Sequence, residues 1–232
     1  LSFLSVFVVP TQAVTVQAID ISSAVSGQAL WITYDSTNNL AWITVGVSQS
    51  NLYKVDLSTV LIQGAGAVTG YTNLLGNACG GSLAGGPFAS TVLGVNIYVT
   101  AWYSNNCIGV AQVRESDGVV LNTWTYSGPV DAKAITNDGT FLYVGVQGKI
   151  LKLTTAGTFS VLATLANSSC EVNGLMLSGS TLWFTEGCST GLGKVNTDGS
   201  GFAEYNCGCS DGGVELASVG SNIYFTSNID HT

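Results

Sequence analysis

Residues 182–199, LWFTEGCSTGLGKVNTDG, join an aromatic-rich strand to a second strand that ends in an Asp-Gly turn. Residues 142–153 repeat this pattern as LYVGVQGKILKL, and shorter copies occur at 97–100 (IYVT), 223–226 (IYFT) and, more loosely, 40–44 (LAWIT). The aligned aromatic residues are spaced 56, 45, 40 and 41 residues apart and are Trp42, Tyr98, Tyr143, Trp183 and Tyr224. A repeat of about 40–45 residues made of short strands is typical of a β-propeller blade. The sequence therefore predicts an all-β propeller of four-stranded antiparallel blades, with about five blades visible.

The composition fits a single folded domain with a sizeable core. The chain has 232 residues, of which 46% are hydrophobic and only 9% are charged. All-β folds of this length are usually one domain, and no apolar run approaches the ~20 residues that a membrane-spanning helix needs. Sheets packed face to face bury both of their surfaces, which accounts for the apolar content. We therefore expect one propeller domain over residues 14–232 and no membrane span.

The net charge restricts the class of partner. Acidic residues outnumber basic ones by 14 to 6, which gives a formal net charge of −8. Binding to nucleic acid needs clustered lysine and arginine to neutralise phosphates, so we expect no nucleic-acid partner. A cationic partner or a metal ion is compatible with this charge, and so is the simpler interpretation that mild acidity aids solubility.

Turn sequences divide each repeat into four antiparallel strands in sequence order. The clearest first hairpin consists of strands at 130–135 and 141–146, because the intervening turn at 136–139 contains Asp-Gly, which favours a tight reversal. A third strand follows at 149–153 and a fourth at 159–165. The predicted blades are Ala29–Gly76, Gly85–Ser127, Gly128–Ala166, Gly174–Tyr205 and the residues from Gly213 onward.

The last predicted blade contains only two strands, and two explanations stay open. In the first, apolar segments at 5–9 and 14–19 complete the blade and close a ring of five blades. In the second, the chain is a fragment of a larger ring. Residues 1–13 are therefore either a closing strand or the remnant of a secretory signal peptide, because an apolar stretch followed by small residues suits cleavage after Ala13.

The positions of four cysteines within the repeat predict two disulfide bonds. In an antiparallel blade, the loop that enters strand one and the loop between strands two and three lie at the same end. Cys79 and Cys107 occupy these two loops in one blade, and Cys170 and Cys188 occupy them in a later blade. Bridges within each pair would each contribute ~3 kcal/mol in the chain-entropy description. Because such bonds require an oxidising compartment, we expect a secreted, extracellular protein.

The remaining cysteines, Cys207 and Cys209, also precede a first strand. Their expected partner would lie just past Asn228, where the sequence has no cysteine. A truncated chain, a local bridge between the two and free thiols all fit this pattern. The Cys-Gly-Cys spacing lacks the two-residue spacer of zinc knuckles, and the sole histidine is His231, so we expect no zinc site.

The repeats resemble those of several propeller families. Residues 182–186 together with 194–201 are similar to repeats of streptogramin lyase-like and NHL propellers, and also to YWTD repeats, in which an aromatic strand precedes a basic residue and an Asp-Gly turn. Residues 130–144 are similar to NHL repeats. The resemblance implies the fold but no particular activity, because unrelated functions share these blades. Streptogramin-type lyases use histidine and a divalent metal; with His231 alone, no catalytic residue is carried over.

Carboxylates are predicted to gather on the face that carries the cysteine loops. Paired carboxylates can perform acid–base chemistry, and an acidic rim around the propeller mouth can hold Ca²⁺ or a cationic ligand; scattered, solvated carboxylates are the alternative. Glu186 stands out because it ends an aromatic strand, where the equivalent residues are Ala101 and Ser227. The carboxylates assigned to this face are Asp131, Glu171, Glu186, Asp211, Glu215 and Asp230.

Trp102 and Tyr103 stand at the corresponding exit of the second blade. An exposed aromatic pair near a concave mouth suits stacking on a sugar or a peptide. The alternative is that both side chains pack beneath the loop between Cys79 and Cys107. In a neighbouring loop, Asn167 begins an Asn-Ser-Ser sequence and is a candidate glycosylation site.

Basic residues recur at one place in the predicted third strands. Such regularity favours a structural role between neighbouring blades over a binding patch. These residues are Lys54, Arg114, Lys152 and Lys194.

Together these patterns favour a secreted, disulfide-braced propeller that binds a protein, peptide or glycan through the cysteine face. The scarcity of catalytic groups makes a binding module the first hypothesis, with Ca²⁺ as the one candidate cofactor. A lyase or hydrolase with a metal at the mouth is the alternative, and a structural role in an extracellular assembly is a third. The ligand-binding candidates are Trp102, Tyr103, Glu171, Glu186 and Asp211.

Overall fold

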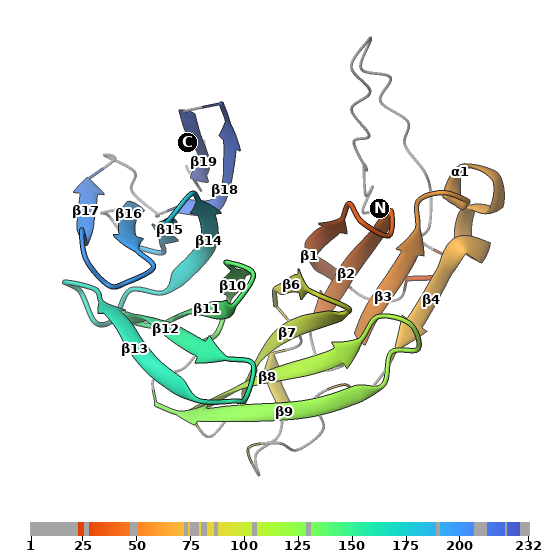
Figure 1. Cartoon of the computed structure of the whole chain (residues 1–232), viewed down its shortest axis with the longest axis horizontal. Helices are drawn as coiled ribbons and strands as arrows, with labels where there is room; N and C mark the ends of the chain where they lie inside the picture. Colours follow the sequence, from red (N-terminus) through yellow and green to blue (C-terminus); the bar gives the residue numbers. More distant parts are fainter. Residues whose placement is uncertain are drawn as a thin grey trace.

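The repeats form five antiparallel sheets that lie side by side around a common axis and make an open arc (Figure 1). The computed structural model describes residues 23–25, 28–46, 51–71, 74, 79, 83–85, 88–103, 106–128, 131–188, 191–206, 213–220 and 222–227. Within these residues the regular structure is almost entirely β-strand, with one α-helix of four residues and one short 3-10 turn. Four sheets contain at least four strands and the fifth contains two. The predicted all-β propeller is confirmed.

The sheets follow one another along the chain. The first contains β1 (Gln28–Asp35), β2 (Leu40–Gly46), β3 (Asn51–Asp56) and β4 (Val68–Tyr71), with α1 (Val60–Gln63) between β3 and β4. The second contains β5 (Leu83–Gly85), β6 (Ser90–Leu93), β7 (Asn96–Tyr103), β8 (Cys107–Arg114) and β9 (Val120–Ser127). Both β5 and β6 pair with β7.

In the remaining three sheets the strands also pair in sequence order; the third and fourth sheets have four strands each and the fifth has two. The third contains β10 (Ala134–Asn137), β11 (Phe141–Val146), β12 (Lys149–Thr154) and β13 (Phe159–Thr164). The fourth contains β14 (Val172–Ser178), β15 (Thr181–Glu186), β16 (Gly191–Asn196) and β17 (Ala203–Asn206). The fifth contains β18 (Gly213–Val219) and β19 (Asn222–Ser227).

Several predicted features lie outside the described residues. They include both interpretations of residues 1–13 and the proposed closing strands at 5–9 and 14–19. The side chains in this group are Cys207, Cys209, Asp211, Asp230 and His231.

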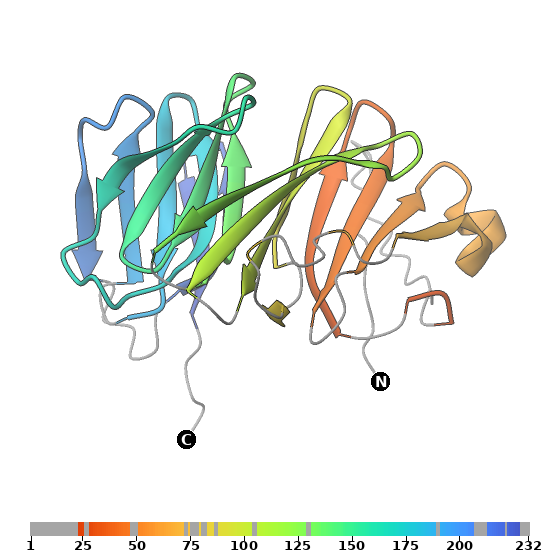
Figure 2. The ribbon, with the colours of Figure 1, turned by 90° about the horizontal axis from the view of Figure 1, so that it is seen from below.

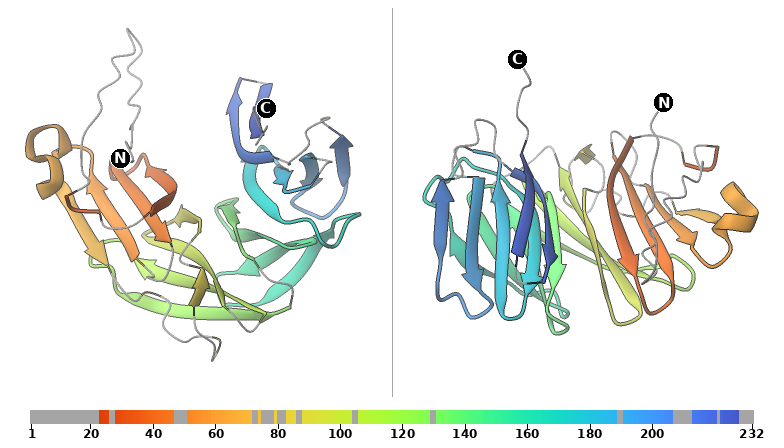
Figure 3. Two further views of the ribbon diagram at one scale, coloured as in Figure 1. Left: turned by 180° about the vertical axis from the view of Figure 1, so that it is seen from behind. Right: turned by 90° about the horizontal axis from the view of Figure 1, so that it is seen from above.

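In the four-stranded sheets the first strand is innermost and the fourth is outermost, and in the second sheet β6 is innermost and β9 outermost (Figure 1). The innermost strands β1, β6, β10, β14 and β18 are successive neighbours around the axis. Seen from the side, the connecting loops gather at the two ends of the strands (Figure 2). The two-stranded sheet β18–β19 stands at one end of the arc and the β1–β4 sheet at the other (Figure 3).

The hydrophobic core lies between successive sheets. Tyr98 of the second sheet shares a buried apolar cluster with Leu142 of the third, and Tyr143 of the third shares one with Leu182 of the fourth. Full burial of one such side chain contributes about 1.5–3 kcal/mol. The aromatic residue that defines the repeat therefore stabilises the contact between its own sheet and the next.

Two lysines of the third strands also join neighbouring sheets. Lys54 Nζ donates a hydrogen bond to the backbone carbonyl of Glu115 at 3.4 Å, and Lys152 Nζ donates one to that of Thr197 at 3.2 Å. Each acceptor directly follows the third strand of the next sheet. For these two lysines, the expected structural role between blades is confirmed.

Arg114 does not share this position, and the prediction for it was wrong. It lies opposite Asn96 at the end of β8, where an exposed ion pair joins it to Asp117 at 2.8 Å. The repeat position in this sheet belongs to Gln112, whose Nε2 donates to Tyr98 Oη at 3.2 Å. Because glutamine replaces lysine at this position, Arg114, the nearest basic residue in the sequence, was wrongly aligned with the lysines of the other sheets.

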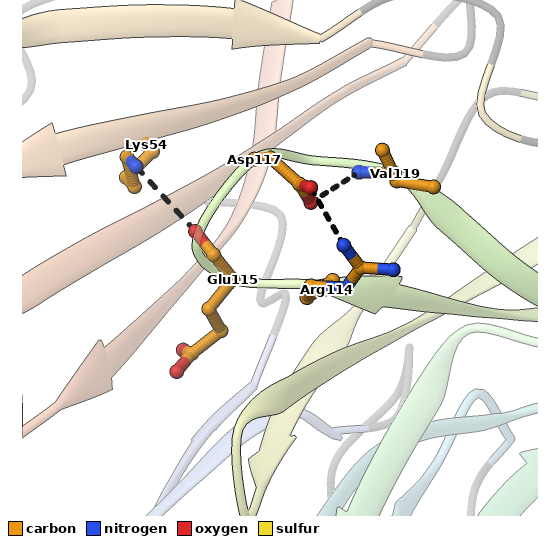
Figure 4. A network of polar contacts seen from close by, with 5 residues as sticks. All are labelled: Lys54, Arg114, Glu115, Asp117 and Val119. Carbon is orange, nitrogen blue, oxygen red and sulfur yellow. Dashed lines mark hydrogen bonds and ion pairs between the residues drawn. The ribbon is translucent and has the colours of Figure 1, made fainter.

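Glu115 is buried and links the second sheet to the first, both through its backbone carbonyl, which accepts a hydrogen bond from Lys54 (Figure 4), and through its carboxylate. Its Oε1 accepts a hydrogen bond from Trp42 Nε1 at 3.1 Å, and its Oε2 accepts one from Asn38 Nδ2 at 3.3 Å. Burial raises the pKa of Glu115, and the nearby carboxylate of Asp35 raises it further. The bond to Trp42 connects this carboxylate to a side chain at the centre of the inter-sheet contact.

We predict that Glu115→Ala lowers the free energy of unfolding by about 2 kcal/mol at pH 7, because it leaves the Trp42 indole N–H buried without an acceptor. Asp117→Ala, in the same turn, is the matched control and should cost less than about 1 kcal/mol, since its ion pair is exposed. Urea unfolding followed by tryptophan fluorescence measures both losses. Equal losses for the two variants would contradict the role assigned to Glu115.

Candidate binding face

Both disulfide bonds lie at the end of the sheets where first strands begin and second strands end. Cys79 is bonded to Cys107 and Cys170 to Cys188, with Cα–Cα distances of 6.1 Å and 5.5 Å. These are the two pairs that the repeat predicted, and they span 28 and 18 residues. We call this end of the molecule the disulfide face.

Hydrogen bonds to backbone carbonyls fix the loop that carries the second disulfide. Gly148 N donates to the carbonyl of Cys170 at 2.7 Å, and Gln147 Nε2 donates to that of Ser169 at 3.1 Å. These bonds tie the β11–β12 hairpin to the loop that enters β14. Gly148 has φ of +71°, and a Cβ there would lie 2.5 Å from the Ser168 carbonyl oxygen. Only glycine therefore permits this close approach of two loops.

Asn167, the candidate glycosylation site, is exposed in the same loop. Its Oδ1 accepts a hydrogen bond from Ser169 N at 3.0 Å. This turn presents the side chain at the surface next to the Cys170–Cys188 bridge, while glycosylation itself stays a prediction.

A cluster of three charged residues spans the third and fourth sheets on this face. Asp131 precedes β10 and Glu171 precedes β14, and the strand registers place them at equivalent positions of their sheets. Lys133 forms an ion pair with Glu171 Oε2, and its Nζ lies 3.9 Å from Asp131 Oδ2. The Asp131, Lys133 and Glu171 side chains are 11%, 27% and 32% exposed, respectively. We call these three residues the rim cluster.

The pKa values of the two carboxylates in the rim cluster are shifted in opposite directions. Burial, together with the hydrogen bond and negative charge of Glu171, raises the pKa of Asp131 to about 7, although the positive charge of Lys133 opposes this shift. The hydrogen bond from Asp131 lowers the pKa of Glu171, and Lys133 lowers it as well. Asp131 is thus the proton donor of the pair and Glu171 is the carboxylate that accepts. Asp131 Oδ1 is buried and has no hydrogen-bond partner among the described residues.

The other predicted carboxylates do not join this cluster at the surface. Glu186, at the end of β15, is buried and lies opposite Val172 in the sheet. Glu215 lies on β18, where burial alone raises its pKa to about 7. The described part of the acidic rim is therefore concentrated at Asp131 and Glu171.

The expected exposed aromatic pair is not present. Tyr103 is fully buried in the apolar cluster that contains Cys107, and burial raises its pKa to about 12. Trp102 is half-buried, and its ring stacks on Phe88 with centroids 6.5 Å apart. The Trp102 Nε1 is buried without a hydrogen-bond partner among the described residues. Of the pair, only Trp102 lies where a ligand can reach part of the ring.

Lys133 and Phe88 were not among the residues predicted from the sequence to lie at this face. The strand registers align Phe88 with Lys133. Phe88 lies two residues before Ser90 of β6, and Lys133 lies two residues before Ile135, the equivalent residue of β10. An alignment of the repeats by register would have placed both at the disulfide face. Their contacts with Glu171 and Trp102 depend on how sheets and loops pack.

Among the residues described here, no group of three or more His, Cys, Asp or Glu side chains is arranged to hold a metal ion. In the same part of the chain, no helix is long and apolar enough to cross a membrane.

Comparison with known proteins shows the fold. No family model and no curated protein matches the sequence. A chain of the nidogen/laminin complex is 18% identical, with a TM-score of 0.66 over 95% of this chain and 80% of that one. The extracellular domain of BT4673 from B. thetaiotaomicron is 13% identical, with a TM-score of 0.58 over 94% of this chain and 27% of that one. The WD40 repeats of RRP9 are 10% identical, with a TM-score of 0.61 over 81% and 53%.

We predict that Asp131→Asn removes part of the pH dependence of stability between pH 5 and 7.5. The folded-state pKa of about 7 exceeds the ordinary value of 3.8, so the folded protein holds a proton that the unfolded chain releases. The free energy of unfolding of the parent protein should therefore fall as pH rises through this window, by at most about 1.4 kcal/mol per pH unit from this group. Chemical unfolding at several pH values measures the slope.

Asp198→Asn is the matched control for this prediction. Hydrogen bonds from Ser200 lower the pKa of Asp198, so it is ionised throughout the window and its replacement should leave the slope unchanged. Identical slopes for the parent protein and Asp131→Asn would show that Asp131 is not the proton holder.

We further predict that the double variant Cys170→Ala and Cys188→Ala loses ~3 kcal/mol of unfolding free energy, because the unfolded chain regains the freedom of an 18-residue loop. Thermal unfolding under non-reducing conditions measures the loss. A reducing agent that breaks the same bond in the parent protein should reduce the difference. A variant as stable as the oxidised parent would refute the contribution of this bond.

Proposed function

We propose that this chain is a secreted recognition module that binds a protein ligand through the disulfide face. The observation that carries the proposal is the rim cluster, in which Asp131, Lys133 and Glu171 from two sheets are held together and partly exposed. Charges held in fixed positions select a partner with complementary charges and speed its association.

Fixed loops favour binding because fewer degrees of freedom are lost on association. The Cys170–Cys188 bond and the contact at Gly148 restrain the loop that carries Glu171 before any ligand arrives. Trp102, stacked on Phe88, adds an aromatic surface on the same face. The mixed charges of the rim cluster favour a protein or peptide, which offers complementary charges, over a neutral glycan.

The proposal of secretion depends on the two disulfide bonds, which persist in oxidising compartments. The likeness to a chain of the nidogen/laminin complex and to an extracellular bacterial domain supports an extracellular module of this shape. Membership of the NHL or YWTD groups is proposed from the repeat sequence at 182–201. A metal-dependent lyase or hydrolase stays a prediction of the streptogramin lyase-like resemblance.

The test is a binding screen of the purified, oxidised chain against an array of extracellular proteins and peptides. We expect at least one ligand whose affinity falls about tenfold or more in Glu171→Lys, because the variant reverses the charge that Lys133 pairs with. Trp102→Ala should weaken the same ligand. A thermal melt of each variant separates lost binding from lost folding.

Asp117→Lys is the matched control, since it makes the same charge reversal on an exposed turn between a third and a fourth strand, at the opposite end of the sheets. Its binding should equal that of the parent protein. A ligand that responds equally to both reversals is attracted by net charge alone, and a screen in which no ligand depends on Glu171 or Trp102 would reject the proposed face.

A further inference from the structure

Asp131 is a nearly buried carboxylate that lacks a hydrogen-bond donor. The whole residue is 8% exposed, and its Oδ1 has no hydrogen-bond partner among the described residues. Its Oδ2 lies 3.9 Å from Lys133 Nζ, which is beyond hydrogen-bond distance. Buried carboxylates are normally hydrogen-bonded, because the loss of water without a replacement costs free energy. Asp131 therefore marks a place in the rim cluster where a donor is missing.

The charged groups that act on Asp131 do not supply this donor. Lys133, from the same sheet, forms its close ion pair with Glu171 instead. Glu171, from the fourth sheet, can share a proton with Asp131 but has no N–H group to donate. Because burial and Glu171 together raise the pKa of Asp131 to about 7, a proton fills this place in part of the free protein near neutral pH.

The charge of the rim cluster favours a cation as the missing donor. With both carboxylates ionised, two negative charges face the one positive charge of Lys133, which leaves a net charge of −1. A divalent metal ion fits poorly, because it needs more oxygen ligands than these two carboxylates and Lys133 repels it. An ammonium or guanidinium group fits better, since it brings one positive charge together with N–H donors.

We propose, on the basis of the function proposed above, that the rim cluster recognises a lysine or arginine side chain of the protein ligand, whose cationic group donates a hydrogen bond to Asp131 Oδ1. The cation enters from the disulfide face beside Lys133 and Glu171, the partly exposed members of the cluster. It replaces the proton as the partner of Asp131, and that proton passes to the solvent. The net charge of −8 attracts such a ligand to the molecule.

The test is a nuclear magnetic resonance titration of the full, oxidised chain with small probes at constant ionic strength. The probes are lysine and arginine, each with an acetylated α-amino group and a methylamide at the carboxyl end. The same derivative of citrulline is the matched probe, because it keeps the shape and N–H groups of arginine without the charge. We expect saturable shifts of the backbone amide signals of Asp131, Lys133 and Glu171 with both cationic probes and none with citrulline.

Two variants of the rim cluster should have opposite effects. Asp131→Asn should weaken binding of the cationic probes about tenfold or more, the loss of one charge-assisted hydrogen bond. Asparagine tolerates the φ of +71° at this position, so the variant changes the charge and keeps the backbone. Lys133→Met should tighten binding several-fold, because it removes the internal cation that competes for Glu171. Thermal melts of both variants check that they fold.

Asp117→Asn is the matched control, since it neutralises an exposed carboxylate at the opposite end of the sheets. It should leave the affinity for the cationic probes unchanged.

The affinity for the cationic probes should also depend on pH. Below the pKa of Asp131, the cation has to displace a proton, so binding should weaken by at most about tenfold per pH unit as the pH falls from 8 to 6. The pKa of Glu171 is lowered, so this carboxylate stays ionised in the same range. Asp131→Asn should remove the dependence.

Four results would overturn the proposal. The first is no saturable binding of either cationic probe. The second is equal binding of citrulline, which would mean that a neutral donor suffices. The third is the same set of shifts with calcium chloride, which would identify a metal site. The fourth is equal affinity of Asp131→Asn and the parent protein.

The outcome is distinguishable from that of the protein array. If the array yields a ligand that depends on Glu171 while neither cationic probe binds, the recognition of a cationic side chain is wrong and the disulfide face remains a binding face. If the cationic probes bind while the array yields no such ligand, the proposed function fails and the preference of the rim cluster for a cation stands.

Discussion

The burial of one aromatic side chain per repeat between successive sheets is the contact on which the rest of the structure depends. Trp42, Tyr98 and Tyr143 are each enclosed by their own sheet and the next. A polar contact accompanies this burial at two of these interfaces, where Lys54 and Lys152 reach the following sheet. Because each sheet packs on the next one in the same way, equivalent strands end at equivalent heights around the axis. That regularity is what gathers the loops into two opposite faces.

The proposed binding face is a direct consequence of this spacing. Asp131 and Glu171 are brought together because they precede the first strands of neighbouring sheets, and Lys133 spans the gap between them. Bringing two carboxylates into a partly buried site that holds a single lysine raises the pKa of one and lowers that of the other. The Cys170–Cys188 bond acts on the loop that carries Glu171, so packing, a covalent bond and electrostatics all restrain this part of the surface.

Topology explains which site residues could be predicted. The pairing of Cys79 with Cys107, and the common face of Asp131 and Glu171, follow from the alternation of loops in antiparallel sheets. The exposed pair expected at Trp102 and Tyr103 failed because consecutive residues of a strand point to opposite sides of the sheet. Tyr103 lies on the side that packs with Trp42 and Leu52 of the first sheet, whereas Trp102 lies on the other side and stacks on Phe88. The alternation of side chains along a strand can be read from the sequence, so it was predictable that the two residues would not face the same way.

The sequence by itself determined the fold class, the division into successive blades, the order of strands in the four-stranded sheets and the disulfide pairs, because all of these follow from local patterns that recur along the chain. Only the tertiary structure decided that burial raises the pKa of Asp131, that Phe88 supports Trp102 and that Tyr224 is exposed while Tyr143 is not. These properties depend on distances and burial between segments that are remote in the sequence. No periodicity within one repeat contains that information.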